Sequence, residues 1–554
     1  MDFWDESKTG PDPDIGRPRE TAEPPQPVET EEHLEPRHDA SQQRAEMRRA
    51  ERAGRTRRRI LLAVLVLVVL LVLAGTVAVA AGAGSHIPIV GTLFAGDTGA
   101  KSSSSTTRAP VTTSTSPGTA TTATGSSSTT LPLASSTTAV DRGVPGPPVS
   151  LTVKVAEGLT ANVLIESPGG GTQKGKTPFK VRAPSGKTTI TLTRGGYNKI
   201  VRDIDLTKDA SLTFWLDPEG LLLQSLVRFP SGSMPKQVAF SPDGKELWIS
   251  LLGGRGLEIY DPYTGKLLDS VRLGTLGGAV EVIFTKDGKT VYASQMESGS
   301  VFEIDRATRK VRRQMFTGGT WTKVMVLSPD EKRLYAANWT SNDVSVIDLA
   351  SGRVVKKIPT VNVPRGLYLT KDEKRLYVAG YELGQFQRID LTTGKSDILL
   401  DTGGALRHMV ANKEGTLLYF DDMAKFQTYV MDVATEKITK LAKTDPEPNT
   451  LDLSPDGKVL YVSCRGLNGA DYMAPGPDWG SVVLIDTATG KTLDAIVGGN
   501  QPTGLDVSPD GKYLAFSDFL DDRIRVFTIP SYEVLVNGGG GRAQSHLAEL
   551  PKKQ

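Results

Sequence analysis

Residues 501–519 read QPTGLDVSPDGKYLAFSDF, in which two short apolar runs flank a Ser-Pro-Asp-Gly turn. Related tetrapeptides recur along the second half of the chain, with their acidic members at Asp243, Asp287, Asp330, Asp372, Glu414, Asp456 and Asp510. The intervals between these acidic residues are 44, 43, 42, 42, 42 and 54 residues. A period of about 42 residues with four strands per unit is typical of propeller blades. The sequence therefore predicts a seven-bladed β-propeller over residues 220–537.

The strands inside each repeat are bounded by Asp-Gly or Thr-Gly turns, which favours β-structure over helix. An aspartate closes the third strand in six repeats, at Asp261, Asp305, Asp348, Asp390, Asp432 and Asp486, and we expect it to cap a turn rather than bind a metal. The sixth repeat carries twelve extra residues within 465–480. For ring closure, the run LLLQSLVRF at 221–229 is the favoured outer strand of the seventh blade, and YEVLV from Tyr532 is the alternative.

Two further runs, LYAANWTSNDVSVIDLASGRV from Leu334 and LYVAGYELGQFQRIDLTTGK from Leu376, carry a family resemblance. Together with the run from Gln501 they resemble the YVTN family of lactonase-like β-propellers. The resemblance implies the fold across the repeats. It says little about activity, because this fold serves surface-layer proteins, binding proteins and lactonases alike.

The segment before the propeller, residues 149–219, contains strand-like runs such as LTVKV from Leu151 and TTITLT from Thr188. The Gly175-Lys176-Thr177-Pro178 turn and the Gly196-Tyr197 pair make this segment similar to the PEGA domain. That resemblance implies a small antiparallel β-sandwich with a spacer or docking role. The predicted fold class is therefore all-β: a PEGA-like sandwich followed by a propeller.

The first 148 residues predict a membrane attachment. Residues 60–84 form 25 positions without a charge, preceded by an arginine-rich segment, which predicts a transmembrane helix with the N-terminus in the cytoplasm. Residues 1–59 are expected to be a disordered cytoplasmic tail with a basic juxtamembrane part, and residues 85–148 a Ser/Thr-rich extracytoplasmic stalk. Residues 538–554 are expected to be a flexible tail. A cleaved signal peptide is the alternative interpretation of the apolar run.

Composition excludes several classes of function. The chain has 65 basic and 63 acidic residues, and no basic block lies in the folded part, so nucleic-acid binding is not expected. One cysteine, Cys464, allows no internal disulfide, and only one of the five histidines, His408, lies in the repeats. No metal site and no cofactor are therefore predicted.

Strand polarity predicts where a binding site lies. The innermost strand of each blade begins on the face where the second strand ends, so residues at these two positions converge on one funnel around the axis. The predicted ligand-binding residues of this funnel are Lys236, Glu281, Gln295, Lys323, Asn338, Trp339, Arg365, Tyr381, Arg407, His408, Asp422, Asn449, Arg465, Thr503 and Asp518.

Four clustered cations favour a polar, carboxylate- or phosphate-bearing ligand or an acidic partner segment. A channel lined by polar residues and satisfied by water is the simpler interpretation. The favoured function is a membrane-anchored binding or scaffold protein acting on an extracellular small molecule, saccharide or protein. The alternative is a hydrolase with His408 or Glu281 as the base and Arg365 or Arg407 as the charge stabiliser, and no sequence signature separates the two.

Overall fold

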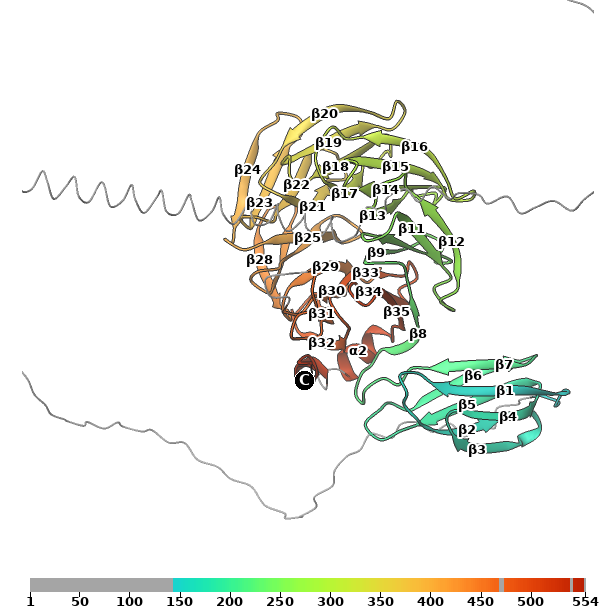
Figure 1. The fold of residues 1–554 in the computed structure, drawn as a ribbon. Helices are drawn as coiled ribbons and strands as arrows, with labels where there is room; N and C mark the ends of the chain where they lie inside the picture. The colour runs from blue at the N-terminus through green and yellow to red at the C-terminus, as the bar shows by residue number, and fades with distance from the viewer. Residues whose placement is uncertain (1–142, 468–472, 539–541, 553–554) are drawn as a thin grey trace, which may run out of the picture. The chain divides into compact units, whose positions relative to one another are not determined.

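The computed structural model describes residues 143–467, 473–538 and 542–552, and most of them lie in β-strands (Figure 1). The expected cytoplasmic tail, the expected transmembrane segment at 60–84 and nearly all of the expected stalk lie outside the described residues. Within those three ranges, no helix has both the length and the apolar character needed to cross a bilayer.

The PEGA-like segment is a two-sheet sandwich with a short 3-10 helix, η1 (Pro168–Gly170). Its strands are β1 (Pro148–Val155), β2 (Asn162–Glu166), β3 (Thr172–Lys176), β4 (Phe179–Pro184), β5 (Gly186–Thr193), β6 (Ile200–Leu206) and β7 (Ala210–Phe214). The sheet orders are β4-β1-β7 and β3-β2-β5-β6. Alternate residues such as Leu151, Val163 and Ile190 face inward and form the core. The implied antiparallel arrangement is incomplete, because β1 and β7 pair in parallel.

The propeller consists of seven four-stranded sheets, as predicted. The first four blades, each ordered from the inner to the outer strand, are β9 (Pro235–Phe240), β10 (Leu247–Leu251), β11 (Gly256–Tyr260) and β12 (Leu267–Arg272); β13 (Ala279–Phe284), β14 (Thr290–Gln295), β15 (Ser300–Asp305) and β16 (Lys310–Phe316); β17 (Thr322–Leu327), β18 (Arg333–Asn338), β19 (Asp343–Asp348) and β20 (Arg353–Pro359); and β21 (Pro364–Leu369), β22 (Arg375–Gly380), β23 (Gln385–Asp390) and β24 (Ser396–Asp401).

The last three blades follow the same order. They are β25 (Leu406–Ala411), β26 (Leu417–Asp422), β27 (Gln427–Asp432) and β28 (Ile438–Lys443); β29 (Pro448–Leu453), β30 (Val459–Cys464), β31 (Ser481–Asp486) and β32 (Thr492–Val497); and β33 (Pro502–Val507), β34 (Tyr513–Asp518) and β35 (Arg523–Thr528), completed by β8 (Gln224–Pro230).

Strand β8 closes the ring. It pairs antiparallel with β35, so the strand that precedes the first blade completes the seventh, and β33 lies beside β9. This confirms the favoured closure. The alternative prediction, an outer strand from Tyr532, is wrong, because Tyr532–Gly538 forms helix α2.

The recurring landmarks are turn residues. In the first blade, Ser241 donates to Asp243 Oδ1 at 2.6 Å, and Gly244 has φ +69°, a conformation that glycine adopts without strain. The aspartates that close the third strands accept backbone N–H groups of the next turn, as Asp305 does from Thr308 at 2.7 Å. The predicted turn-capping role is therefore confirmed.

The C-terminal residues differ from expectation. Instead of a flexible tail, they form α3 (Arg542–Ser545) and the 3-10 helix η2 (His546–Glu549). His546 is buried, and its Nε2 lies 2.8 Å from Asp445 Oδ2. A β-bridge between Asp478 and Pro551 joins this segment to the extra residues of blade six. Local composition does not predict a buried polar contact between residues that are about a hundred positions apart in the sequence.

Candidate functional site

The site is built by an irregularity that recurs in every blade. Near the start of each inner strand the pairing register shifts, which leaves one or two residues unpaired with the second strand. The residues skipped in this way are Lys236, Val280, Glu281, Lys323, Val324, Arg365, Arg407, His408, Asn449, Thr503 and Gly504. Bulges re-aim side chains, and here they direct them towards the axis.

One cavity of about 30 Å³ collects most of these side chains. Its lining includes Lys236, Glu281, Lys323, Arg365, Arg407, His408 and Asn449, all predicted from the sequence. Lys323 and Arg407 are buried, whereas Lys236, Glu281, Arg365 and His408 are half-buried. We call Lys236, Lys323, Arg365 and Arg407 the basic arc.

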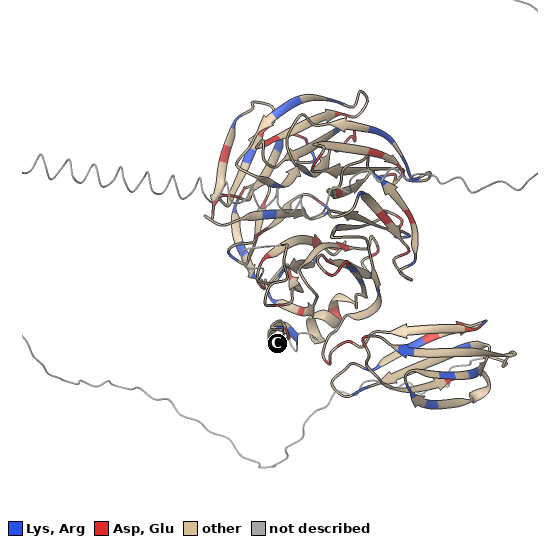
Figure 2. Cartoon of the chain, viewed as in Figure 1, with Lys and Arg blue, Asp and Glu red and all other residues tan. Residues whose placement is uncertain are grey.

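Few carboxylates share the cavity with the basic arc, although Asp421 and Glu447, which do not line it, interact with Arg407. Glu281 is the one carboxylate among the described lining residues. Across the described part of the chain, no carboxylate forms an ion pair with Lys236 or Lys323, while elsewhere on the propeller acidic and basic residues are interspersed (Figure 2). A local excess of positive charge therefore faces the cavity.

The acid–base behaviour of the cavity follows from this charge. Burial lowers the pKa of Lys236 well below its usual value, the guanidinium groups of Arg407, Arg465 and Arg365 lower it further, and Glu281 opposes them. Burial likewise lowers the pKa of Lys323. For Glu281, burial raises the pKa to about 7 in spite of the neighbouring cations.

Aromatic rings partly compensate the arc. Lys323 Nζ lies 3.3 Å from the ring centroid of Trp339, and Arg365 Cζ lies 4.2 Å from Trp339 and 4.7 Å from Tyr381. Arg407 Cζ follows at 5.9 Å from Tyr381. Each such contact contributes about 0.5–2 kcal/mol, depending on desolvation. Cations and rings of blades three to five therefore alternate in the order Lys323, Trp339, Arg365, Tyr381 and Arg407.

The predicted residues that end the second strands do not line the cavity. Gln295 donates to the carbonyls of Leu273 and Leu276, both at 2.8 Å, and Asp422 accepts the backbone N–H of Ala405 at 2.9 Å. Asn338 and Asp518 are also fully buried and hydrogen-bonded. Gln295, Asp422 and Asp518 bind the loop that arrives from the preceding blade, whereas Asn338 bonds to strand residues of its own blade. Placing Gln295, Asn338, Asp422 and Asp518 in the funnel was therefore wrong.

Two other predicted residues, Thr503 and Arg465, are not among those that line the cavity. Thr503 is buried, and its hydroxyl donates to the Gln501 carbonyl at 2.9 Å. Arg465 is also buried, contacts Gln501 and lies 5.5 Å from the ring centroid of Phe519. Arg465 influences the cavity through its charge, since it lowers the pKa of Lys236.

Sequence reasoning missed two carboxylates of blades six and seven, which we call the acidic arc: Asp452 and Asp506. Asp506 Oδ2 accepts the backbone N–H of Phe240 in blade one at 2.6 Å, and Asp452 Oδ2 accepts that of Val507 at 2.8 Å. Burial raises the pKa of both, to about 6 for Asp452. The sequence did contain a signal for these two carboxylates, because both occupy an inner-strand position that is apolar in the other five repeats.

His408 also acts between blades. Its Nδ1 accepts the backbone N–H of Leu451 at 3.2 Å, and burial lowers its pKa to about 4. A neutral imidazole that accepts at Nδ1 carries its proton on Nε2, so neither nitrogen has a free lone pair for a substrate proton. This hydrogen bond counts against His408 as a general base.

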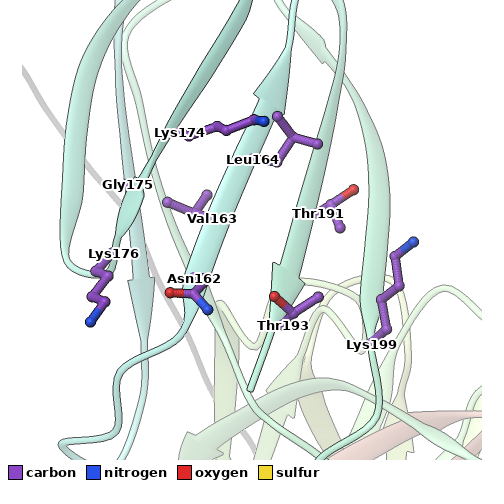
Figure 3. A pocket seen from close by; sticks show the side chains of 9 residues that line it. All are labelled: Asn162, Val163, Leu164, Lys174, Gly175, Lys176, Thr191, Thr193 and Lys199. Atoms are coloured by element: carbon purple, nitrogen blue, oxygen red, sulfur yellow. The ribbon is translucent and has the colours of Figure 1, made fainter. Parts of the chain in front are cut away.

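A second hollow lies on the PEGA-like domain (Figure 3). Its floor is the outward face of the sheet β3-β2-β5-β6, where Asn162, Thr191 and Thr193 lie between Lys174 and Lys176 on one side and Lys199 on the other. Strand β3 is at the edge of that sheet, and exposed lysines on an edge strand discourage pairing with another strand. A structural role accounts for these lysines.

Comparisons with known proteins agree with this architecture. The family model described as "Lactonase, 7-bladed beta-propeller" matches residues 191–370, and the PEGA domain model matches residues 162–219. The fold thus defines a lactonase-like propeller joined to a PEGA domain.

A curated relative places the chain in a family. The chain is 36% identical over 329 residues to antigen Lp49 of Leptospira interrogans, serovar copenhageni, a match that covers 56% of this chain and 71% of the antigen. The chain belongs to the family of antigen Lp49. A solved structure, hydrazine synthase of Kuenenia stuttgartiensis, aligns with 20% identity and a TM-score of 0.47 over 54% of this chain and 97% of that one.

Proposed function

We propose that the protein is a binding protein whose propeller mouth holds an anionic group, most simply a carboxylate, of a small molecule or partner segment. The observation that carries this proposal is the basic arc: four cations from four blades line one cavity with a single carboxylate. Like charges repel, so an anion that binds among these cations is favoured.

The size of the cavity limits the ligand. A water needs roughly 10–15 Å³, so about 30 Å³ admits a group of two or three heavy atoms. A larger ligand therefore inserts its anionic end here and leaves the rest outside, where Trp339 and Tyr381 supply apolar contact. Ligand-binding clefts that enclose a whole small molecule usually measure about 300–1,000 Å³.

The setting of this function is also a proposal. An arginine-rich segment followed by the apolar run 60–84 and a Ser/Thr-rich segment supports display of the PEGA domain and the propeller outside the membrane, on a single anchor. Protease treatment of intact cells tests this: digestion of the propeller supports display, and its protection while the cells stay intact contradicts it.

Calorimetric titration with succinate and inorganic phosphate tests the binding proposal. We expect the full-length chain to bind at least one of them, and the variant Lys323→Ala/Arg365→Ala/Arg407→Ala to lose about 100-fold or more in affinity, since charge-assisted hydrogen bonds contribute about 1.5–3 kcal/mol each. The matched control is Lys332→Ala/Lys374→Ala/Lys413→Ala, which removes the same charge from exposed turns. Equal affinity in both variants, or no binding of either anion, would overturn the proposal.

A further inference from the structure

Lys236 differs from the other members of the basic arc. Lys323, Arg365 and Arg407 each lie against an aromatic ring, whereas no described ring, hydrogen-bond acceptor or ion-pair partner contacts the Lys236 ammonium. It is half-buried in a cavity that it shares with the two arginines. Its amine is therefore crowded by positive charge and makes no direct contact with an acceptor, while Glu281 in the same cavity opposes the cations.

The amine of Lys236 is the group through which the arc can reduce its repulsion. Guanidinium groups keep their proton under all ordinary conditions, but a lysine in a cationic, desolvated site releases its proton readily. Burial and the nearby arginines lower the pKa of Lys236 accordingly. A neutral amine that opens into a small cavity is a nucleophile.

We propose that Lys236 is a carbamylation site that takes up carbon dioxide. The lone pair on Nζ attacks the carbon of CO₂, and one C–O π bond breaks to leave its electrons on oxygen. The proton then carried by the nitrogen leaves to water. The product is a carbamate with two carboxylate oxygens, and no oxidant or reductant takes part.

The cavity suits this product in size and in charge. The carbamate adds three heavy atoms, which matches a space of about 30 Å³. Arg365 and Arg407 line the same space, and the planar fork of a guanidinium matches a carboxylate. The modification replaces the amine of Lys236 by an anion and so adds a negative charge beside Arg365 and Arg407.

The inference uses the cavity of the proposed function but stands without any ligand. The carbamate fills the place that a ligand carboxylate would take, so CO₂ and an anionic ligand compete for the arc. Carbon dioxide would then regulate binding at the mouth.

Chemical trapping tests the inference. The full-length protein is equilibrated with ¹³C-bicarbonate, alkylated with trimethyloxonium and mapped by mass spectrometry. We expect the methylated carbamate on Lys236 at roughly tenfold or greater occupancy than on the exposed Lys332 in the same sample, because each unit by which a lysine pKa is lowered increases the neutral fraction about tenfold. Occupancy should rise with pH.

Two variants complete the test. Lys236→Arg keeps the charge and must lose the adduct, and Arg365→Met/Arg407→Met must lower its occupancy. No adduct on Lys236, or equal labelling of Lys236 and Lys332, would overturn the inference. If succinate binds and no carbamate is trapped, this inference fails alone; if the carbamate forms and neither succinate nor phosphate binds, the proposed function fails alone.

Discussion

The basic arc and the acidic arc occupy the same ring of inner strands, but they are built in opposite ways. In blades six and seven, Asp452 and Asp506 accept backbone N–H groups of the next blade and so join the sheets. In blades three to five, the cations Lys323, Arg365 and Arg407 reach the cavity, where the rings of Trp339 and Tyr381 accompany them. One arc holds the ring together, and the other presents charge to a ligand.

This difference assigns a structural role to the acidic arc and a binding role to the basic arc, although both lie on the inner strands of the same repeat. A polar group that is fully engaged with neighbouring backbone stabilises the fold, whereas clustered like charges destabilise it and are retained for use. Substitutions in the acidic arc should therefore change the free energy of unfolding and spare binding, and substitutions in the basic arc should do the reverse.

The largest expected effect is on stability, in Asp452→Ala/Asp506→Ala. Each change leaves a backbone N–H, of Val507 or Phe240, without its acceptor, and a buried unsatisfied donor costs about 1–3 kcal/mol. We expect the free energy of unfolding in urea to fall by about 2–6 kcal/mol, with succinate affinity at low temperature within about twofold of the original. The exposed carboxylate change Asp205→Ala is the control, and a double variant as stable as this control contradicts the structural role.

The next effect is on binding, in Arg407→Met. Methionine keeps much of the buried volume but removes the charge, so we expect the affinity for succinate to fall about 10- to 100-fold, in keeping with one lost charge-assisted hydrogen bond. The free energy of unfolding should change by less than about 1 kcal/mol, because repulsion is relieved as the contact with Tyr381 is lost. Unchanged affinity with a large loss of stability would reassign Arg407 to structure.

The pH dependence of binding sharpens the comparison further. An anion favours protonated Lys236, Lys323 and Glu281, and the pKa of Glu281 is about 7 while the lysine values are lowered. Affinity is therefore highest below that value and falls as pH rises through it, by at most about tenfold per unit for each group that titrates. Calorimetry across neutral pH measures this fall. In Glu281→Gln, the fall in affinity near pH 7 should become smaller. An affinity that increases with pH would contradict the expectation that the anion binds best when these groups are protonated.

The smallest expected effect is at the rings. Trp339→Phe keeps an aromatic surface beside Lys323 and Arg365 but weakens its attraction for cations, since tryptophan is the strongest partner. We expect a two- to fivefold change in succinate affinity, on the order of 0.5–1 kcal/mol. An unchanged affinity would indicate that the Trp339 ring only packs against its neighbours and does not contribute to binding.

The sequence predicted the fold well because short motifs that recur in every blade determine its turns and strands. The tetrapeptide turns and strand-closing aspartates recur at a nearly constant spacing in the first five repeats, and the run at 221–229, which contains the closing strand β8, was the favoured outer strand. The predicted starts of the inner strands converge because every blade repeats the same bulge, so one register determines seven positions.

The features that the sequence did not predict depend on the direction of side chains and on contacts between residues far apart in the chain. Gln295 and Asp422 end strands on the correct face, but they turn to the loop of the preceding blade, and no periodicity encodes that choice. The buried contact of His546 with Asp445 joins residues about a hundred positions apart. Asp452 and Asp506 could have been found, as acidic residues in an otherwise apolar row.

The most direct test of the central claim is a crystal structure of the protein in bromide, located by its anomalous scattering. The account predicts a bromide ion in the axial cavity, within hydrogen-bond distance of the guanidinium groups of Arg365 and Arg407. Bromide sites confined to the outer surface, with only water between those two arginines, would contradict it.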